Sequence, residues 1–318
     1  MKRRDWIKTA GVAAMVGSTT NRFALPAIAA DDSVTPSRVV DTHTHFYDPS
    51  RPQGVPWPGK DTPLYRTVLP ADWHAVAGPV GVTQTIVVEA SPWVEDNQWV
   101  LDIAKNEKSI VGLVGNLDPR DADFSKHLSR FAKNPIFRGI RWRSDLVPIE
   151  RDRDVLVRAA NELKELDLQL DLNGPCQALP LANRLAAEVP DLRIVINHLG
   201  GSGDPQSIHA DWHANVREIA RRENVFMKVS ALPEQVRCEP GQAPADTQYY
   251  LPILDHLWEC FGEDRLIFGS NWPVSDRGAP YDVVYKIVSE YFADKGQTAT
   301  EKYFWKNSQV AYRWSERV

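Results

Sequence analysis

Cysteine and long apolar runs are scarce in this chain of 318 residues. Its three cysteines, Cys176, Cys238 and Cys260, follow no metal-binding spacing and give no reason to propose a disulfide. The sequence contains no Gly-x-Ser-x-Gly, which argues against a serine hydrolase. No Gly-x-Gly-x-x-Gly follows the first predicted strand, which counts against a dinucleotide-binding open sheet. We also find no internal repeat, low-complexity tract or interdomain linker.

The N-terminal residues 1–30 are typical of an export signal rather than of a folded domain. Arg3 and Arg4 form a twin-arginine start, and a short, mildly apolar stretch follows. That stretch is too short to cross a hydrocarbon layer of about 30 Å. Small residues around Ala29 and Ala30 predict cleavage there, which predicts passage through the twin-arginine export machinery.

Residues 31–318 are therefore predicted to form one domain that is periplasmic or secreted. Residues 1–30 hold five basic residues and one acidic residue, so the formal net charge changes from −5 to −9 when they are removed. An acidic domain of this kind does not favour binding to nucleic acid, and no stable membrane insertion is expected after cleavage. The expected partner is a small-molecule substrate, and a homo-oligomer is compatible with the sequence.

The remaining chain alternates short apolar runs with amphipathic helical patterns. The predicted strands are 39–45, 83–90, 110–117, 137–142, 168–172, 193–197, 225–230 and 266–269. Segment 154–163 is an example of the helical pattern, with apolar residues three and four positions apart. Strands that alternate with helices pair in parallel through right-handed crossovers. Eight such units predict an α/β fold, a (β/α)₈ TIM barrel, with a doubly wound open sheet as the alternative.

Three further segments lie outside this alternation. The proline-rich segment Pro49–Pro70 follows the first strand and is predicted to form a wall or lid over a pocket. A second irregular segment, Pro233–Asp246, follows the seventh strand on the same side of the barrel. A last helix over Thr300–Trp314 is expected to pack outside the barrel.

Polar residues cluster where the predicted strands end. Alternate side chains of a strand share one face, so Asp41, His43 and His45 are predicted to project the same way. The other strand ends supply Glu89, Arg141, His198 and Asn271. A parallel barrel gathers such residues around one mouth, where barrel enzymes place their active sites.

Histidines from two strands could hold a metal ion. His43, His45 and His198 together could bind Zn²⁺ and leave one position open for water. Zinc lowers the pKa of bound water to about 7 and polarises carbonyl groups. A divalent metal, with Zn²⁺ as the first choice, is therefore predicted, and a metal-free site is the alternative.

Four motifs resemble those of the amidohydrolase-related hydrolases. They are Asp41–Phe46, Asn197–Gly201, Phe268–Val274 and Glu301–Phe304 with Asn307. Their order and spacing are most similar to the branch of sugar and dicarboxylate lactonases. The resemblance implies a distorted (β/α)₈ barrel with an extra C-terminal helix that hydrolyses a cyclic ester. It also implies that His43, His45 and His198 are metal or substrate ligands and that Arg141 contacts a substrate carboxylate or carbonyl.

The sequence departs from that family at one position. The family usually has aspartate in the Gly-Ser-x-Trp-Pro motif, where it takes a proton from water, but this chain has Asn271. A carboxamide does not titrate near neutral pH, and a general base typically contributes about 10² to 10⁴ in rate. Asn271 could orient water while Asp276, Asp171 or a histidine accepts the proton. Alternatively, a strongly acidifying metal makes the base less necessary, or the activity is lost or changed.

These observations predict an exported lactonase that opens a sugar-acid or carboxylated lactone by water attack. His43, His45, His198 and Asn271 are the predicted catalytic residues, and Arg141, Glu89 and Trp272 are the predicted substrate contacts. Two groups of alternatives stay open. One is a different reaction on the same barrel, by a metal-independent lactonase, a lyase, a decarboxylase or an isomerase. The other is a non-catalytic periplasmic binding protein.

Overall fold

A computed structural model describes residues 34–143 and 152–317. The predicted signal peptide lies outside the described residues, and so does its predicted cleavage site. Within the described part of the chain, no helix has both the length and the apolar character needed to cross a membrane.

Eight parallel strands form one sheet in the order β1-β2-β3-β4-β5-β6-β9-β10. They are β1 (Val40–Thr44), β2 (Gln84–Val88), β3 (Ile110–Gly115), β4 (Phe137–Arg143), β5 (Gln169–Asn173), β6 (Ile194–Ile196), β9 (Val225–Val229) and β10 (Leu266–Phe268). All eight predicted runs contain strands, and most of them are apolar segments bounded by polar residues or turn residues. A small antiparallel hairpin, β7 (Gly203–Asp204) and β8 (Ser207–Ile208), follows β6.

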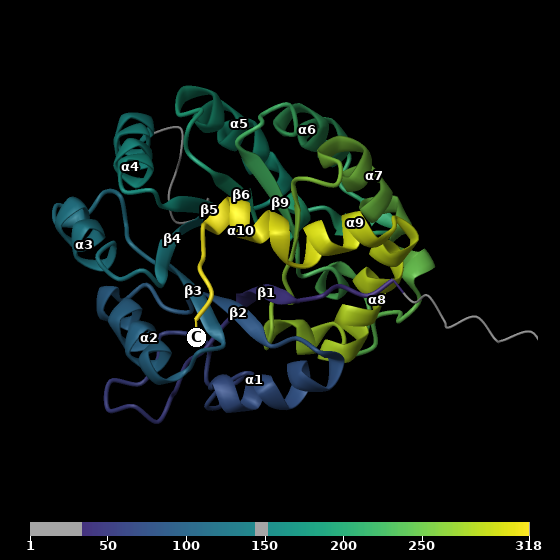
Figure 1. The fold of residues 1–318 in the computed structure, drawn as a ribbon, viewed down its shortest axis with the longest axis horizontal. Helices are drawn as coiled ribbons and strands as arrows, with labels where there is room; N and C mark the ends of the chain where they lie inside the picture. The colour runs from purple at the N-terminus through teal and green to yellow at the C-terminus, as the bar shows by residue number, and fades with distance from the viewer. Residues whose placement is uncertain (1–33, 144–151, 318) are drawn as a thin grey trace, which may run out of the picture. The chain divides into compact units, whose positions relative to one another are not determined.

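Helices connect successive strands and surround the sheet, as Figure 1 shows. They are α1 (Pro70–Ala77), α2 (Val94–Asn106), α3 (Phe124–Phe131), α4 (Arg153–Glu165), α5 (Leu179–Glu188), α6 (Trp212–Ile219), α7 (Leu251–Phe261) and α8 (Tyr281–Asp294). Their buried residues are mostly apolar, and they pack on the outer face of the strands. The predicted helix at 154–163 lies within α4.

The first and last strands meet and close the sheet into a barrel. The amide of Asn271 donates to the His43 carbonyl over 2.8 Å, and the amide of His45 donates to the Trp272 carbonyl over 2.9 Å. A parallel bridge joins Thr44 to Trp272. The predicted (β/α)₈ barrel is therefore confirmed. Its closure also places the histidine motif of β1 directly beside the segment that follows β10.

The C-terminal segment corrects one prediction. It consists of α9 (Gln297–Glu301), a π-helical turn (302–306) and α10 (Asn307–Tyr312), and Figure 1 shows α10 crossing the centre of the ring of helices. The expectation that this segment packs outside the barrel is wrong. Ala311, Tyr312 and Trp314 are buried in one apolar cluster with strand residues such as Val40 and Phe226.

The same segment is tied to the amino ends of two strands. Arg138, at the start of β4, donates to the Tyr312 carbonyl over 2.9 Å. Arg193, just before β6, donates to the Ala311 carbonyl over 2.8 Å. The apolar interior at this end needs a cover, and the C-terminal segment supplies it. The carboxyl ends of the strands lie at the opposite end of the barrel.

Candidate active site

Three histidines from two strand ends meet at the carboxyl end of the barrel. The ring centres of His43 and His45 on β1 lie 5.0 Å apart. The ring of His198, which follows β6, lies 4.5 Å from that of His43. His43 and His45 are buried, and His198 is partly exposed. The structure thus brings together residues that are separated by about half of the chain, as predicted.

The backbone around these residues is unusual. His198, Leu199 and Asn271 have φ angles of 53°, 60° and 67°, in the left-handed region that residues with side chains rarely adopt. Such conformations are found most often at functional sites, where surrounding structure holds them in place. Gly269 contributes a close approach instead. A side chain there would begin 2.9 Å from His43 Cβ and 3.2 Å from Lys228 Cδ.

Hydrogen bonds fix the orientation of two of the imidazoles. Nδ1 of His45 lies 3.0 Å from the Val88 carbonyl oxygen, to which it donates. Nδ1 of His198 lies 2.9 Å from the Ser230 hydroxyl. Burial lowers the pKa of His45 to about 3, and burial also lowers the pKa of His43 and of His198 well below the ordinary value. All three imidazoles are therefore neutral at physiological pH.

His43 lies between two cationic side chains. Its Nε2 is 3.4 Å from Nη1 of Arg141, and its Nδ1 is 3.5 Å from Nζ of Lys228. Lys228 is fully buried inside the barrel and forms an ion pair of 2.8 Å with Asp171. The sequence pattern does not reveal the role of Lys228. Its place between Met227 and Val229 fits an ordinary strand alternation and gives no sign that its side chain points into the barrel.

This environment tests the predicted zinc site. A metal ligand must direct a lone pair at the ion, but both ring nitrogens of His43 face N–H groups of cations. Across the described residues, no group of three or more histidine, cysteine, aspartate or glutamate side chains is arranged to hold a metal ion. In this arrangement the residues do not fit a three-histidine metal centre.

The predicted substrate contacts Arg141 and Glu89 bind each other. Nε of Arg141 donates to Glu89 Oε1 over 2.8 Å, and Nη2 approaches the same oxygen at 2.7 Å. Nη2 also donates to the Glu89 carbonyl over 3.0 Å. Arg141 is thus held rigidly, with its Nη1 edge directed at His43. A guanidinium fixed in this way can stabilise negative charge that develops on a substrate oxygen.

Asn271 lies between His45 and the carboxylate of Glu234, which the sequence pattern does not single out. Asn271 Oδ1 lies 3.3 Å from His45 Nε2, and its Nδ2 donates to Glu234 Oε1 over 2.9 Å. The other carboxylate oxygen, Glu234 Oε2, is buried without a hydrogen-bond partner. Glu234 lies in a 3₁₀ turn (Pro233–Gln235), within the irregular segment that was recognised after the seventh strand. The missing carboxylate at 271 was the signal that could have prompted a search for another one on the neighbouring loop.

Asp171 and Asp276, the two carboxylates predicted as possible proton acceptors, have surroundings that differ from those of Glu234. Asp171 accepts from Lys228, from Asn197 over 2.9 Å and from Tyr312 over 3.0 Å, so all of its oxygen atoms are occupied. Asp276 is exposed and faces Arg66 at 3.9 Å. Asp171 therefore serves the interior of the barrel rather than proton transfer.

Asp41 holds neighbouring segments together through hydrogen bonds, and its partners differ from the cations beside His43. It accepts from the amides of His43 and Ser270 over 3.1 and 2.8 Å, and from the Tyr281 hydroxyl over 3.0 Å. Pairing between β1 and β2 shifts register after Asp41, which interrupts the regular alternation of faces. Asp41 thus ties β1 to the segment after β10.

Two tryptophans near the mouth differ in exposure. Trp272 is only 2% exposed and packs in the core, so it offers little surface to a substrate. Trp57, from the proline-rich loop, is partly exposed, and its ring centre lies 5.7 Å from that of His45. A pocket of about 360 Å³ is lined by Trp57, Tyr47 and Glu89, among others. These contacts agree with the predicted wall beside the site.

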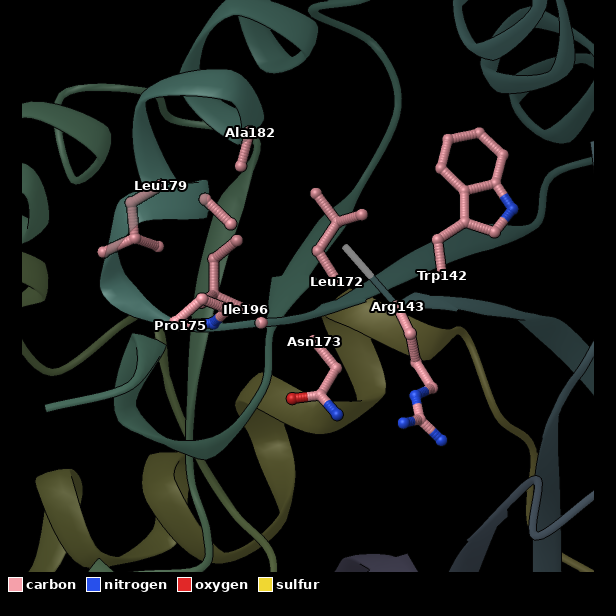
Figure 2. Close-up of a pocket in the computed structure, with 10 residues that line it drawn as sticks. Trp142, Arg143, Leu172, Asn173, Pro175, Leu179, Ala182 and Ile196 are labelled. Atoms are coloured by element: carbon pink, nitrogen blue, oxygen red, sulfur yellow. The ribbon is translucent and has the colours of Figure 1, made fainter. Parts of the chain in front are cut away.

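A second pocket of about 350 Å³ lies on the helix-facing side of the strands. Figure 2 shows Trp142 and Leu172 extending to one side of β4 and β5, and Arg143 and Asn173 to the other. The pocket is lined mainly by apolar side chains, such as Leu179 of α5, and by none of the predicted site residues. We therefore assign the chemistry to the cluster of histidines and not to this pocket.

Neutral histidines and a fixed guanidinium thus lie at the carboxyl ends of the strands of a parallel barrel, where barrel enzymes place their active sites. The chain belongs to the amidohydrolase family, whose family model matches residues 40–314. It is 32% identical over 239 residues to an L-fucono-1,5-lactonase of Burkholderia ambifaria, covering 74% of this chain and 80% of the relative. It is 26% identical over 276 residues to an L-fucono-1,5-lactonase of Burkholderia multivorans, covering 84% and 92%. The resemblance to the lactonase branch is thereby confirmed.

Solved structures show the same fold. An amidohydrolase from Burkholderia multivorans with bound zinc has a TM-score of 0.78 at 24% identity, covering 88% of this chain and 100% of that chain. A probable 2-pyrone-4,6-dicarboxylic acid hydrolase from Acinetobacter baumannii, with citric acid bound, has a TM-score of 0.70 at 15% identity and covers 87% and 100%.

Proposed function

We propose that this chain is an exported lactonase that opens the cyclic ester of a sugar acid by attack of water. The carrying observation is the match to two L-fucono-1,5-lactonases over most of their lengths. The cluster of neutral histidines beside Arg141 supports it, because such a cluster suits a polar, uncharged ring with a carbonyl group. The export part of the proposal rests on the twin-arginine pattern at Arg3 and Arg4.

The side chains at the site can perform the two tasks that lactone opening requires. Water attack places negative charge on the carbonyl oxygen, and the fixed guanidinium of Arg141 supplies positive charge to stabilise it. A proton must also leave the water and reach the ring oxygen that departs. His198 presents a neutral, partly exposed ring whose Nδ1 is occupied by Ser230, so its Nε2 is the atom available to bind substrate or water.

The proposed mechanism contains no step through a metal. Zinc on His43, His45 and His198 has support from the zinc-bound neighbour, but the two cations beside His43 oppose it. We expect protein prepared without chelators to contain much less than one zinc per chain by elemental analysis. One tightly bound zinc per chain that His43→Ala removes would show instead that Arg141 and Lys228 move away from His43.

The experiment that tests the lactonase proposal is a substrate panel. The mature protein is purified and given sugar 1,4- and 1,5-lactones, including L-fucono-1,5-lactone, and dicarboxylate lactones, while proton release is followed. We expect turnover of at least one sugar lactone and its loss in His43→Ala. A wild-type rate equal to that of His43→Ala on every lactone would refute the proposal. Light scattering on the same sample measures the oligomeric state.

Asn271 favours a second candidate, a binding protein that has lost its base. This candidate predicts tight binding of a lactone by calorimetry with no proton release, and a gain of turnover in Asn271→Asp. A lyase, decarboxylase or isomerase on the same barrel would give a new product by mass spectrometry without ring opening. The substrate panel separates all of these outcomes.

A further inference from the structure

The segment after β9 brings a carboxylate, that of Glu234, beside Asn271. Gly278 packs against the turn that carries Glu234. A side chain at Gly278 would begin 2.7 Å from the Glu234 amide nitrogen and 2.6 Å from the Pro233 carbonyl carbon. Only a residue without a side chain permits this approach, so the turn is held firmly against the loop after β10. Asn271 then binds the Glu234 carboxylate over 2.9 Å.

The two oxygens of Glu234 have different surroundings. Oε1 accepts from Asn271, whereas Oε2 is buried and has no partner in the described residues. Burying a carboxylate oxygen without a hydrogen bond is costly, and proteins keep such groups mainly where they have a task. Arg277 and Asp276 on the adjacent 3₁₀ turn interact electrostatically with Glu234, and so does Tyr250, which directly precedes α7.

The hydrogen bonds around Asn271 favour a proton on Glu234. His45 donates through Nδ1 to Val88, so the neutral ring can only accept at Nε2. While Glu234 is ionised, Asn271 donates to it and turns its own oxygen toward this accepting nitrogen. Once Glu234 is protonated, the amide can turn over, accept from Glu234 and donate to His45. The protonated state therefore matches a donor with an acceptor at both contacts of Asn271, with Glu234 and with His45.

We propose that Glu234 is the base of this site and takes the place of the carboxylate that residue 271 lacks. The inference rests on the proposed lactonase function. The attacking water loses a proton to Glu234 as its oxygen forms a bond to the lactone carbonyl carbon. The ring C–O bond then breaks, and the same proton passes to the departing ring oxygen. The product is the open hydroxy acid, and Glu234 returns to its ionised form.

Burial supports this role, because it raises the pKa of Glu234 to about 7. A base with a pKa near the working pH combines a useful ionised fraction with a strong affinity for protons. The acid limb of the rate profile should therefore lie near neutral pH rather than near pH 4.

The test compares Glu234→Gln with Glu239→Gln, which removes an exposed carboxylate from the same segment after β9. Turnover of the lactone that the wild-type protein opens is measured by proton release from pH 5 to 9. We expect Glu234→Gln to lose about 10² to 10⁴ in kcat and to lose the acid limb, with little change in KM. Glu239→Gln should keep both the rate and the acid limb of the wild type. Thermal melting of each variant checks that the fold is intact.

A double variant moves the carboxylate from residue 234 to residue 271. Asn271→Asp with Glu234→Gln should regain at least tenfold over Glu234→Gln, with the acid limb at lower pH. The proposal stands if Glu234→Gln loses both rate and limb, and it is overturned if either is unchanged. A wild-type protein that opens no lactone overturns the lactonase proposal and this one together. Normal turnover in both the wild type and Glu234→Gln overturns this one alone.

Discussion

Asp171 is a carboxylate on β5 inside the barrel, Glu234 is a carboxylate on the loop after β9, and their surroundings are opposite. Asp171 accepts from Lys228, Asn197 and Tyr312, so its charge is balanced and its oxygens are occupied. Glu234 has one amide partner and one buried oxygen without any in the described structure. The contrast separates a group that holds the fold together from a group that is available for chemistry. Burial alone would not distinguish the two.

The largest effect is expected when Asp171 loses its charge. Asp171→Asn leaves the buried Lys228 ammonium without its counter-charge, which should cost about 3–5 kcal/mol of unfolding free energy. Urea denaturation measures the loss. Glu218→Gln removes the partner of Arg221 in an exposed pair and serves as the control, with an expected cost of about 0–1 kcal/mol. Equal costs for the two variants would mean that the buried pair has no special role.

A third carboxylate, Glu89, differs from both because it pairs with Arg141, a cation that faces the histidines. Arg141→Ala removes the guanidinium that faces His43, and we expect kcat/KM to fall about 10² to 10³. Arg143→Ala, two residues along the same strand but exposed, should lose much less. Steady-state kinetics on the preferred lactone measure both. A larger loss for Arg143→Ala would transfer the anchoring role to that residue.

A smaller effect tests whether the partners of Asp171 are structural. Tyr312→Phe removes one hydrogen bond from a buried carboxylate oxygen and should cost about 1–3 kcal/mol, with kcat unchanged. Tyr303 is the matched control, because it is also fully buried but its hydroxyl has no partner among the described residues. Tyr303→Phe should therefore be neutral or stabilising. A drop in kcat for Tyr312→Phe would contradict a purely structural role.

The smallest expected effect concerns the pH dependence of stability. The folded-state pKa of Glu234, about 7, lies above its ordinary value of 4.5, so the folded protein binds this proton more tightly than the unfolded chain. Glu234 does not lower the free energy of unfolding below about pH 4, and it lowers that free energy progressively more as the pH rises toward 7. Glu234→Gln removes the cost. Its Tm should exceed that of the wild type by a few degrees at pH 8 and by less at pH 5. A constant difference would mean that Glu234 titrates normally.

Local sequence predicted the strands because each strand is a short apolar run between polar segments. It also predicted that His43, His45 and His198 meet, since parallel strands bring their carboxyl ends to one rim. It did not predict Lys228, because alternation along β9 does not tell the inside of a barrel from the outside. It misplaced the C-terminal helix for a related reason. An amphipathic pattern shows that one face is covered but does not show which surface covers it.

Residue order by itself determined the barrel, the family and the replacement of a carboxylate by Asn271, since these depend on patterns within short segments. Only the tertiary structure decided which charges stand together. The cations on either side of His43 and the carboxylate beside Asn271 come from strands and loops far apart in the chain. Electrostatic interactions depend on distance in space, and their strength changes with burial, so no reading along the chain could rank Glu234 above Asp171 or Asp276.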